Sequence, residues 1–125
     1  MLELKNVSFF KDNKHILRNI NLKIDNSKLI AITGPNGSGK SSLAKIIMGI
    51  FTPDSGQILF NGQDITNLDI TERAKLGIGF AFQQPVRFKG LTVKDLINIA
   101  AGNNIKLSEA CDYLSDVGLC AKEYL

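Results

Sequence analysis

The sequence has 125 residues, a formal net charge of +3, and 44% hydrophobic residues. A chain of this length forms one domain or a piece of one, and its balance of apolar and charged residues is typical of globular proteins rather than disordered segments. The positive charge is too small to imply binding to nucleic acid or to an anionic membrane. No apolar run approaches the ~18–20 residues that a membrane-spanning helix needs.

The cysteine content and the N-terminus both favour a cytoplasmic protein. Cys111 and Cys120 have no second pair, which is typical of reduced thiols in a cytosolic protein. Polar residues interrupt the apolar positions of the first five residues, unlike those of a signal peptide.

The first 51 residues predict strands of two kinds and one helix. Residues 2–9 and 20–25 alternate apolar and polar side chains, which is typical of antiparallel strands, and residues 11–14 between them predict a polar turn. The run at 29–32 is wholly apolar and predicts a strand buried on both faces of a parallel sheet. After a glycine-rich loop, residues 40–51 are apolar on nearly all sides and predict a buried helix.

The middle of the chain predicts a hairpin, a short helix and another strand. Asn61-Gly62 follows an apolar run and predicts a tight hairpin turn. Asp69 and Glu72 have the spacing of a capping box, which predicts the start of a helix. Residues 78–82 alternate bulky and small side chains and predict a strand.

The last third of the sequence predicts helices. Thr92 and Asp95 have the spacing of a capping box that opens a helix running to about Ala101. Ser108 is predicted to cap a second helix, which Gly118 ends. Strands followed by helices in this order predict an α/β or α+β fold.

One loop carries a specific chemical signal. Residues 34–41 read GPNGSGKS and match the phosphate-loop pattern G-x-x-x-x-G-K-[ST], with a predicted strand before the loop and a predicted helix after it. The backbone N–H groups of such a loop converge on phosphate oxygens, and the positive end of the helix dipole points to the same place. Lys40 is predicted to reach the β- and γ-phosphates, Ser41 to ligate Mg²⁺, and Ser42 to bind an α-phosphate oxygen. The predicted nucleotide-binding residues of the loop are Asn36, Gly37, Ser38, Gly39, Lys40, Ser41 and Ser42.

The loop does not by itself select one class of phosphate-loop protein. A dinucleotide-binding loop would need glycine or alanine where Ser42 stands. A GTPase would need an Asn-Lys-x-Asp guanine reader, which the sequence lacks. A small phosphate-loop kinase, a further alternative, would need an arginine-rich lid, and the three arginines do not cluster.

The order of motifs resembles the nucleotide-binding domain of ATP-binding cassette (ABC) proteins. The matching segments are residues 17–22, the loop as Walker A, 53–58, 61–65, 82–85 as the Q-loop, and 91–93. The resemblance covers essentially the whole chain. It implies an α/β fold, namely an incomplete P-loop NTPase (RecA-like core) with an antiparallel β subdomain and the start of a helical subdomain. The expected boundaries are 1–27 and 57–66 for the β subdomain, 28–51 and 77–90 for the core, and 91–125 for the helical subdomain.

The resemblance also implies ATP and Mg²⁺ as cofactors and assigns roles outside the loop. Gln83 is the Q-loop glutamine, whose amide would contact Mg²⁺ and the attacking water, so the catalytic candidates are Lys40 and Gln83. The family places an aromatic ring under adenine, and Phe10 or Phe9 could serve, although Lys11 stands at the aligned position and core packing explains either ring equally well. His15, the only histidine, is expected to be a solvated turn residue.

The sequence leaves two candidates for the full-length protein. Residues 73–83 with Pro85 and Val86 are similar to the iron–sulfur assembly ATPase of the Suf system, which works with a scaffold protein. The alternative is the ATPase of a membrane ABC transporter, held peripherally at the membrane by its permease. Both imply a second ABC subunit as a partner across bound ATP, and neither implies nucleic acid. A third interpretation is a non-catalytic module that binds nucleotide without turnover.

Several family motifs do not occur in the sequence. There is no Walker B strand ending in Asp-Glu, no signature motif and no later switch histidine, so the chain looks like the N-terminal half of a domain nearly twice as long. We therefore expect negligible ATP hydrolysis by this chain. Turnover comparable to that of a full-length homologue, abolished by Lys40→Ala, would contradict this. We also expect exposed apolar surface on residues 29–33 and 77–82, and association into dimers or larger species.

Overall fold

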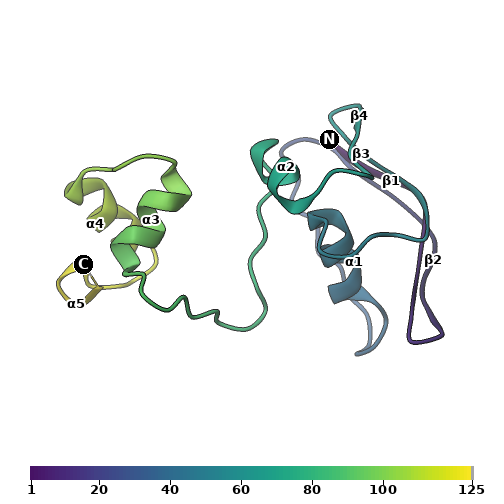
Figure 1. The fold of residues 1–125 in the computed structure, drawn as a ribbon, viewed down its shortest axis with the longest axis horizontal. Helices are drawn as coiled ribbons and strands as arrows, with labels where there is room; N and C mark the ends of the chain where they lie inside the picture. The colour runs from purple at the N-terminus through teal and green to yellow at the C-terminus, as the bar shows by residue number, and fades with distance from the viewer. Residues whose placement is uncertain (125) are drawn as a thin grey trace. The chain divides into compact units, whose positions relative to one another are not determined.

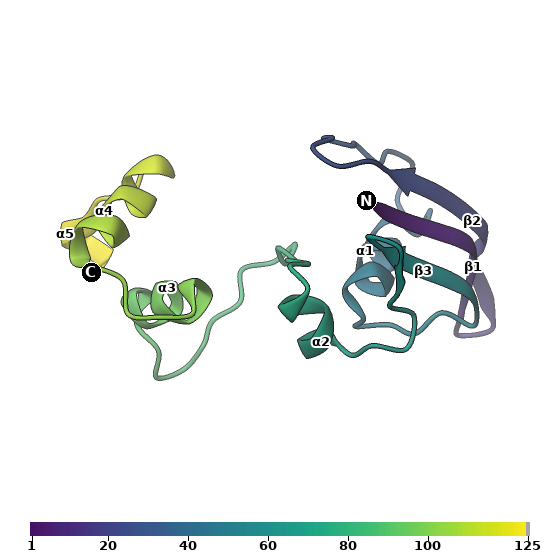
Figure 2. The same cartoon turned by 90° about the horizontal axis from the view of Figure 1, so that it is seen from above.

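The structure is a computed structural model that describes residues 1–124. The chain divides into two compact units, Met1–Ala81 and a second that begins at Phe82. Figures 1 and 2 show the elements of each unit, strands and two helices in the first and helices alone in the second. Among the described residues, no helix combines the length and the apolar character needed to cross a membrane.

The first unit is built on a four-stranded antiparallel sheet with the order β2-β1-β3-β4. β1 (Leu2–Lys11) and β2 (Lys14–Ile24) form a hairpin, and β3 (Ser55–Phe60) pairs with the other edge of β1 (Figure 2). β4 (Gln63–Asp64) follows β3 through the turn at Asn61-Gly62, where both residues have positive φ, as a tight hairpin turn requires. The two predicted alternating strands and this predicted turn are confirmed.

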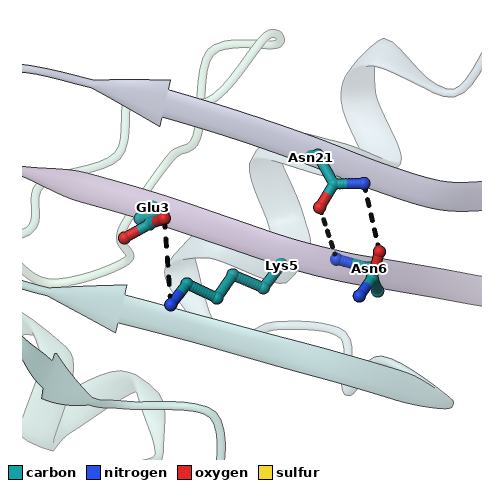
Figure 3. Close-up of polar contacts among 4 residues, drawn as sticks. All are labelled: Glu3, Lys5, Asn6 and Asn21. Carbon is teal, nitrogen blue, oxygen red and sulfur yellow. Dashed lines mark hydrogen bonds and ion pairs between the residues drawn. The ribbon is translucent and has the colours of Figure 1, made fainter.

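Side-chain amides bridge an irregularity in the β1–β2 pairing. The register shifts just beyond Leu4. There the Asn6 N–H donates to Asn21 Oδ1 at 3.0 Å, and Asn21 Nδ2 donates back to Asn6 Oδ1 at 3.2 Å (Figure 3). These bonds satisfy groups that the ladder leaves unpaired at a bulge. Glu3 and Lys5 form an ion pair of 3.9 Å on the same strand, an exposed contact that contributes little to stability.

One hydrophobic core joins the sheet to the helix α1 (Lys40–Met48). The core consists of Leu4, Val7, Phe9, Leu17, Leu43, Ile46, Ile58 and Ile65. The predicted buried helix is confirmed. It ends at Met48, earlier than predicted, because Gly49 adopts a left-handed conformation and its N–H turns back to the carbonyls of Lys45 and Ile46.

Two shorter helices begin where the capping boxes predict. α2 (Ile70–Lys75) is capped by Asp69, whose side chain accepts from the Glu72 N–H at 2.8 Å. α3 (Val93–Ala101), in the second unit, is capped by Thr92 and is followed by Gly102 in a left-handed conformation. Both helix starts are confirmed.

The end of the chain differs from its prediction. α4 (Leu107–Asp116) has Lys106 as its N-cap, whose N–H donates to the Glu109 carboxylate at 3.2 Å, so Ser108 lies inside the first turn and does not cap the helix. A further short helix, α5 (Ala121–Tyr124), was not predicted.

The predicted buried strand at 29–32 and the predicted strand at 78–82 are both wrong. Residues 29–33 and 77–82 belong to no strand, and the side chain of Leu29 is fully exposed, with Ile30 at 47%. A strand buried on both faces needs neighbours that supply both ladder hydrogen bonds and cover. The described sheet is purely antiparallel and pairs with neither segment. The expected exposure of apolar side chains in these segments is confirmed at Leu29, Ile30 and Phe82.

Candidate functional site

The predicted phosphate loop leads directly into α1. Gly39 is the N-cap of the helix in a left-handed conformation (φ 95°, ψ 8°), and Lys40 is the first helical residue. The Leu43 N–H donates to the Gly39 carbonyl at 2.9 Å and closes the first turn. No acidic residue lies in that turn, so its free N–H groups and the positive end of the helix dipole suit an anion.

Strand β2 fixes the position of this helix start. A methyl group placed on Gly39 would lie 2.9 Å from Leu17 Cδ2 and 3.1 Å from the Ile16 carbonyl oxygen. Only a residue without a side chain allows this approach of the loop to the strand. The phosphate loop is therefore held against the sheet at its C-terminal end.

The Lys40 ammonium binds the loop's own backbone. Lys40 Nζ donates to the carbonyl oxygens of Gly34 and Pro35, the latter at 2.8 Å, and to Ser38 Oγ at 3.4 Å. The Ser38 N–H also donates to the Pro35 carbonyl at 3.2 Å. Lys40 thus bridges the two ends of the loop, with its ammonium group against the loop backbone.

The other predicted residues lie in the loop or in the first turn of α1. Asn36, Gly37, Ser38 and Ser41 are exposed, whereas Gly39 and Ser42 are half-buried. Among the described residues, no group of three or more His, Cys, Asp or Glu side chains could hold a metal ion. The predicted Mg²⁺ ligand Ser41 fits a different arrangement, in which Mg²⁺ takes one or two protein ligands and otherwise phosphate oxygens and water.

The structure separates the two candidate aromatic rings. Phe9 is a core residue that stacks on Phe51 with ring centroids 5.2 Å apart. Phe10 is 51% exposed, and its N–H donates to Asp54 Oδ2 at 2.6 Å. Core packing, which the sequence allowed for both rings, therefore applies to Phe9 and not to Phe10.

His15 is not a solvated turn residue. It lies in β2, opposite Phe10, and the two rings stack with centroids 4.0 Å apart. Its Nε2 atom is buried and has no hydrogen-bond partner among the described residues. The sequence prediction failed because the hairpin turn is shorter than the polar segment, so His15 falls inside the strand. The next two residues, Ile16 and Leu17, are the ones that lie against Gly39.

Gln83 is exposed and belongs to the unit that begins at Phe82, whereas the loop belongs to the first unit. Its predicted role at Mg²⁺ and the attacking water therefore stays a prediction.

A buried arginine near the helix α1 was missed by sequence reasoning. Arg73 of α2 is 1% exposed and donates to backbone carbonyls of both α1 and the 66–68 turn. Burial lowers the pKa of its guanidinium from the ordinary value. A single arginine in a short polar helix carries no sequence signal of burial.

Comparisons with known proteins show the family of this chain. A family model described as "ABC transporter" matches residues 17–124. An uncharacterized ABC transporter ATP-binding protein of Methanocaldococcus jannaschii is 40% identical over 108 residues, which are 85% of this chain and 43% of that protein. A sulfate/thiosulfate import ATP-binding protein of Synechocystis is 49% identical over 90 residues, 72% of this chain and 24% of that protein. The chain thus spans less than half the length of these relatives.

Solved structures show the same fold. A nucleotide-free ATP-binding cassette from an ABC transporter matches with a TM-score of 0.72 and 30% identity, over 90% of this chain and 45% of that one. A dimeric cassette bound to ADP and Pi matches with a TM-score of 0.74 and 26% identity, over 93% of this chain and 57% of that one. These matches confirm the α/β P-loop NTPase fold. The family match, its solved relatives and the loop closed by Lys40 lead to one conclusion: the chain belongs to the ABC transporter family.

Proposed function

We propose that this chain binds MgATP through the phosphate loop and the first turn of α1, as part of an ABC-type ATPase. The observation that carries the proposal is the Lys40 ammonium at the loop, at the start of a helix whose first turn holds no acidic residue. A triphosphate can replace the Pro35 carbonyl and the Ser38 hydroxyl as acceptors of that ammonium. The dimeric relative that holds ADP and Pi supports the same ligand class.

Different residues of the loop and of the first helical turn bind different parts of MgATP. The backbone N–H groups from Gly37 to Ser42 cradle the phosphate oxygens, and Ser42 takes an α-phosphate oxygen. Ser41 offers its hydroxyl to Mg²⁺, which would neutralise charge on the phosphates. Asn36 lies exposed within the loop, and Gln83 would bring a second side chain to Mg²⁺.

The base binds on the Phe10 ring. The exposed Phe10 ring stacks on the ring of His15. The residue after His15, Ile16, lies against the loop residue Gly39, which links this ring pair to the loop. Stacking of a base on such a ring is tolerant of sequence and contributes about 1–3 kcal/mol.

The whole protein is proposed to be the ATPase of a membrane ABC transporter. The relatives described above carry transporter names, and one solved cassette is a dimer, so a second ABC subunit and a permease are the partners we propose. The resemblance of residues 73–86 to the Suf iron–sulfur assembly ATPase has no support in those names. We keep it as the second candidate, with a scaffold protein as the partner, and either role would place the protein in the cytoplasm.

Calorimetric titration with MgATP tests the binding proposal. We expect saturable binding by the wild-type chain and a loss of about 100-fold or more in Lys40→Ala, because a charge-assisted hydrogen bond contributes about 1.5–3 kcal/mol and the ammonium makes more than one. Lys45→Ala is the matched control, since Lys45 lies in the last turn of the same helix, with Nζ 5.2 Å from the Phe51 ring centroid. Equal MgATP binding by Lys40→Ala and Lys45→Ala would overturn the proposal.

A further inference from the structure

Arg73 closes the C-terminal end of α1. Its Nη1 donates to the carbonyl oxygens of Ile46 at 2.7 Å and Ile47 at 2.9 Å, both in the last turn of the helix. Its Nε donates to the Leu68 carbonyl and its Nη2 to the Thr66 carbonyl, each at 3.0 Å. All three guanidinium nitrogens are therefore bonded to backbone oxygens from two separate segments of the chain.

The helix itself compensates the charge of Arg73. No carboxylate forms an ion pair with its guanidinium in the part of the chain that the structure describes. The acceptors in α1 are the carbonyls at the negative end of the helix dipole, where a cation is stabilised. The guanidinium also packs against the helix cap, because a methyl group on Gly49 would lie 3.2 Å from Arg73 Nε.

The opposite end of α1 carries the phosphate loop. The helix has nine residues, Lys40 to Met48, and so spans about 13 Å. Within a packed unit, a helix this short moves as a rigid body, and holding one end restricts the other. The N-terminal end is fixed by Gly39 against β2, and the C-terminal end by Arg73. The backbone of Arg73 also accepts from the Ile78 N–H at 3.2 Å, at the start of the stretch that leads to Gln83.

We propose that Arg73 is a positioning residue for the phosphate loop: by holding the C-terminus of α1 it sets the affinity for MgATP without contacting the nucleotide. The inference rests on the proposed function for its effect on affinity. Its effect on the loop backbone can be measured without nucleotide.

Two substitutions and one control separate positioning from folding. Arg73→Lys keeps the charge but has one nitrogen, which cannot span acceptors in both segments, and Arg73→Met keeps the length without the charge. Lys75→Met is the matched control, since Lys75 is an exposed cation in the last turn of α2. Each variant is titrated with MgATP, and amide hydrogen exchange is measured in β1 and β3, in α1, and in the loop.

For Arg73→Lys we expect unchanged protection in β1 and β3, exchange at least ~10-fold faster in the last turn of α1 and the loop, and MgATP affinity weakened by about 10-fold. For Arg73→Met we expect changes in exchange and in MgATP affinity in the same direction but larger. For Lys75→Met we expect wild-type exchange and wild-type affinity. The inference is overturned if Arg73→Lys keeps wild-type MgATP affinity, if loop exchange does not change, or if both Arg73 variants lose protection throughout the sheet. If the wild type itself binds no MgATP, the proposed function fails, and the positioning role is then decided by loop exchange alone.

Discussion

The rings of Phe10 and His15 lie nearly parallel across the β1–β2 hairpin, inclined by 13° with centroids 4.0 Å apart. The stack fixes an aromatic side chain that is otherwise half in solvent. A ring held in one orientation loses little conformational entropy when a base stacks on it, because the ordering has already taken place on folding.

The Phe10 ring is expected to bind the adenine base. Phe10→Ala should weaken MgATP binding by about 5- to 150-fold, which corresponds to the loss of one base–aromatic stack of about 1–3 kcal/mol. Binding of magnesium tripolyphosphate, which has no base, should not change. Phe88→Ala is the control, because Phe88 is exposed to a similar extent, 50% against 51% for Phe10. Equal losses for both ligands would show that Phe10 acts through the fold and not through the base.

The approach of Gly39 to β2 gives a stability prediction. Gly39→Ala combines a left-handed backbone (φ +95°) with a methyl group 3.1 Å from the Ile16 carbonyl oxygen and 2.9 Å from Leu17 Cδ2. Gly37→Ala is the control, because Gly37 has φ +83° and no atom near its would-be methyl group. Both variants carry the conformational cost of about 1–2 kcal/mol, and crowding adds about 1–3 kcal/mol at Gly39 alone. Urea unfolding measures the loss of stability in each variant. Equal losses in Gly39→Ala and Gly37→Ala would contradict the close packing of the loop on the strand.

The capping box of α3 gives a pH prediction. Asp95 Oδ2 accepts from the Thr92 N–H at 2.8 Å and from Thr92 Oγ1 at 2.7 Å, and these bonds, the backbone one first, lower the pKa of Asp95. Because the pKa is lower in the folded chain than in the unfolded chain, the carboxylate stabilises the helix above the ordinary Asp pKa of about 3.9, and that stabilisation is lost as the pH falls through the folded value.

Carbon-detected NMR of the Asp95 carboxyl group tests this. We expect its titration midpoint to lie below the ordinary Asp pKa of about 3.9, and the first turn of α3 to fray as Asp95 becomes protonated. In Thr92→Val the midpoint of Asp95 should rise. An Asp95 midpoint that Thr92→Val leaves unchanged would refute the contribution of the Thr92 hydroxyl, since valine keeps the backbone N–H.

The exposed run at 29–32 is expected to drive self-association of the chain. Ile30 is 47% exposed beside the fully exposed Leu29, and unpaired apolar segments of this kind promote association. Sedimentation should detect dimers or larger species in the wild type and a shift toward monomer in Ile30→Lys. Ile70→Lys is the matched control, since Ile70 is 44% exposed on α2 of the same unit. A monomeric wild type at high concentration would rule out the association.

Local chemistry made much of the fold predictable from sequence. The helix starts at Asp69 and Thr92 depend on side chains that bond to the backbone within three residues, and the turn at Asn61-Gly62 depends on residues that tolerate positive φ, so their sequence signals suffice. The phosphate loop is predictable for the same reason, because glycines and a helix start occur within eight consecutive residues.

The features that sequence reasoning missed depend on distant partners. The apolar run at 29–32 has the composition of a strand, but a strand also needs a neighbour to pair with. Phe9 and Phe10 could not be distinguished from the sequence, because the register shift of β1 between them, which separates a buried ring from an exposed one, depends on the pairing with β2. Arg73 bonds to carbonyls at Ile46 and Ile47, 27 and 26 residues away, which no local pattern indicates.

The close packing of Gly39 on β2 has a consequence for the rate of nucleotide binding. Since the sheet already holds the C-terminal end of the loop, nucleotide arrival needs the Lys40 ammonium to exchange acceptors rather than a segment of backbone to become ordered. We expect association to be governed by diffusion and by screening of the ammonium charge, and therefore to slow as ionic strength rises. Differences in affinity among loop variants would then appear chiefly in the residence time of the bound nucleotide.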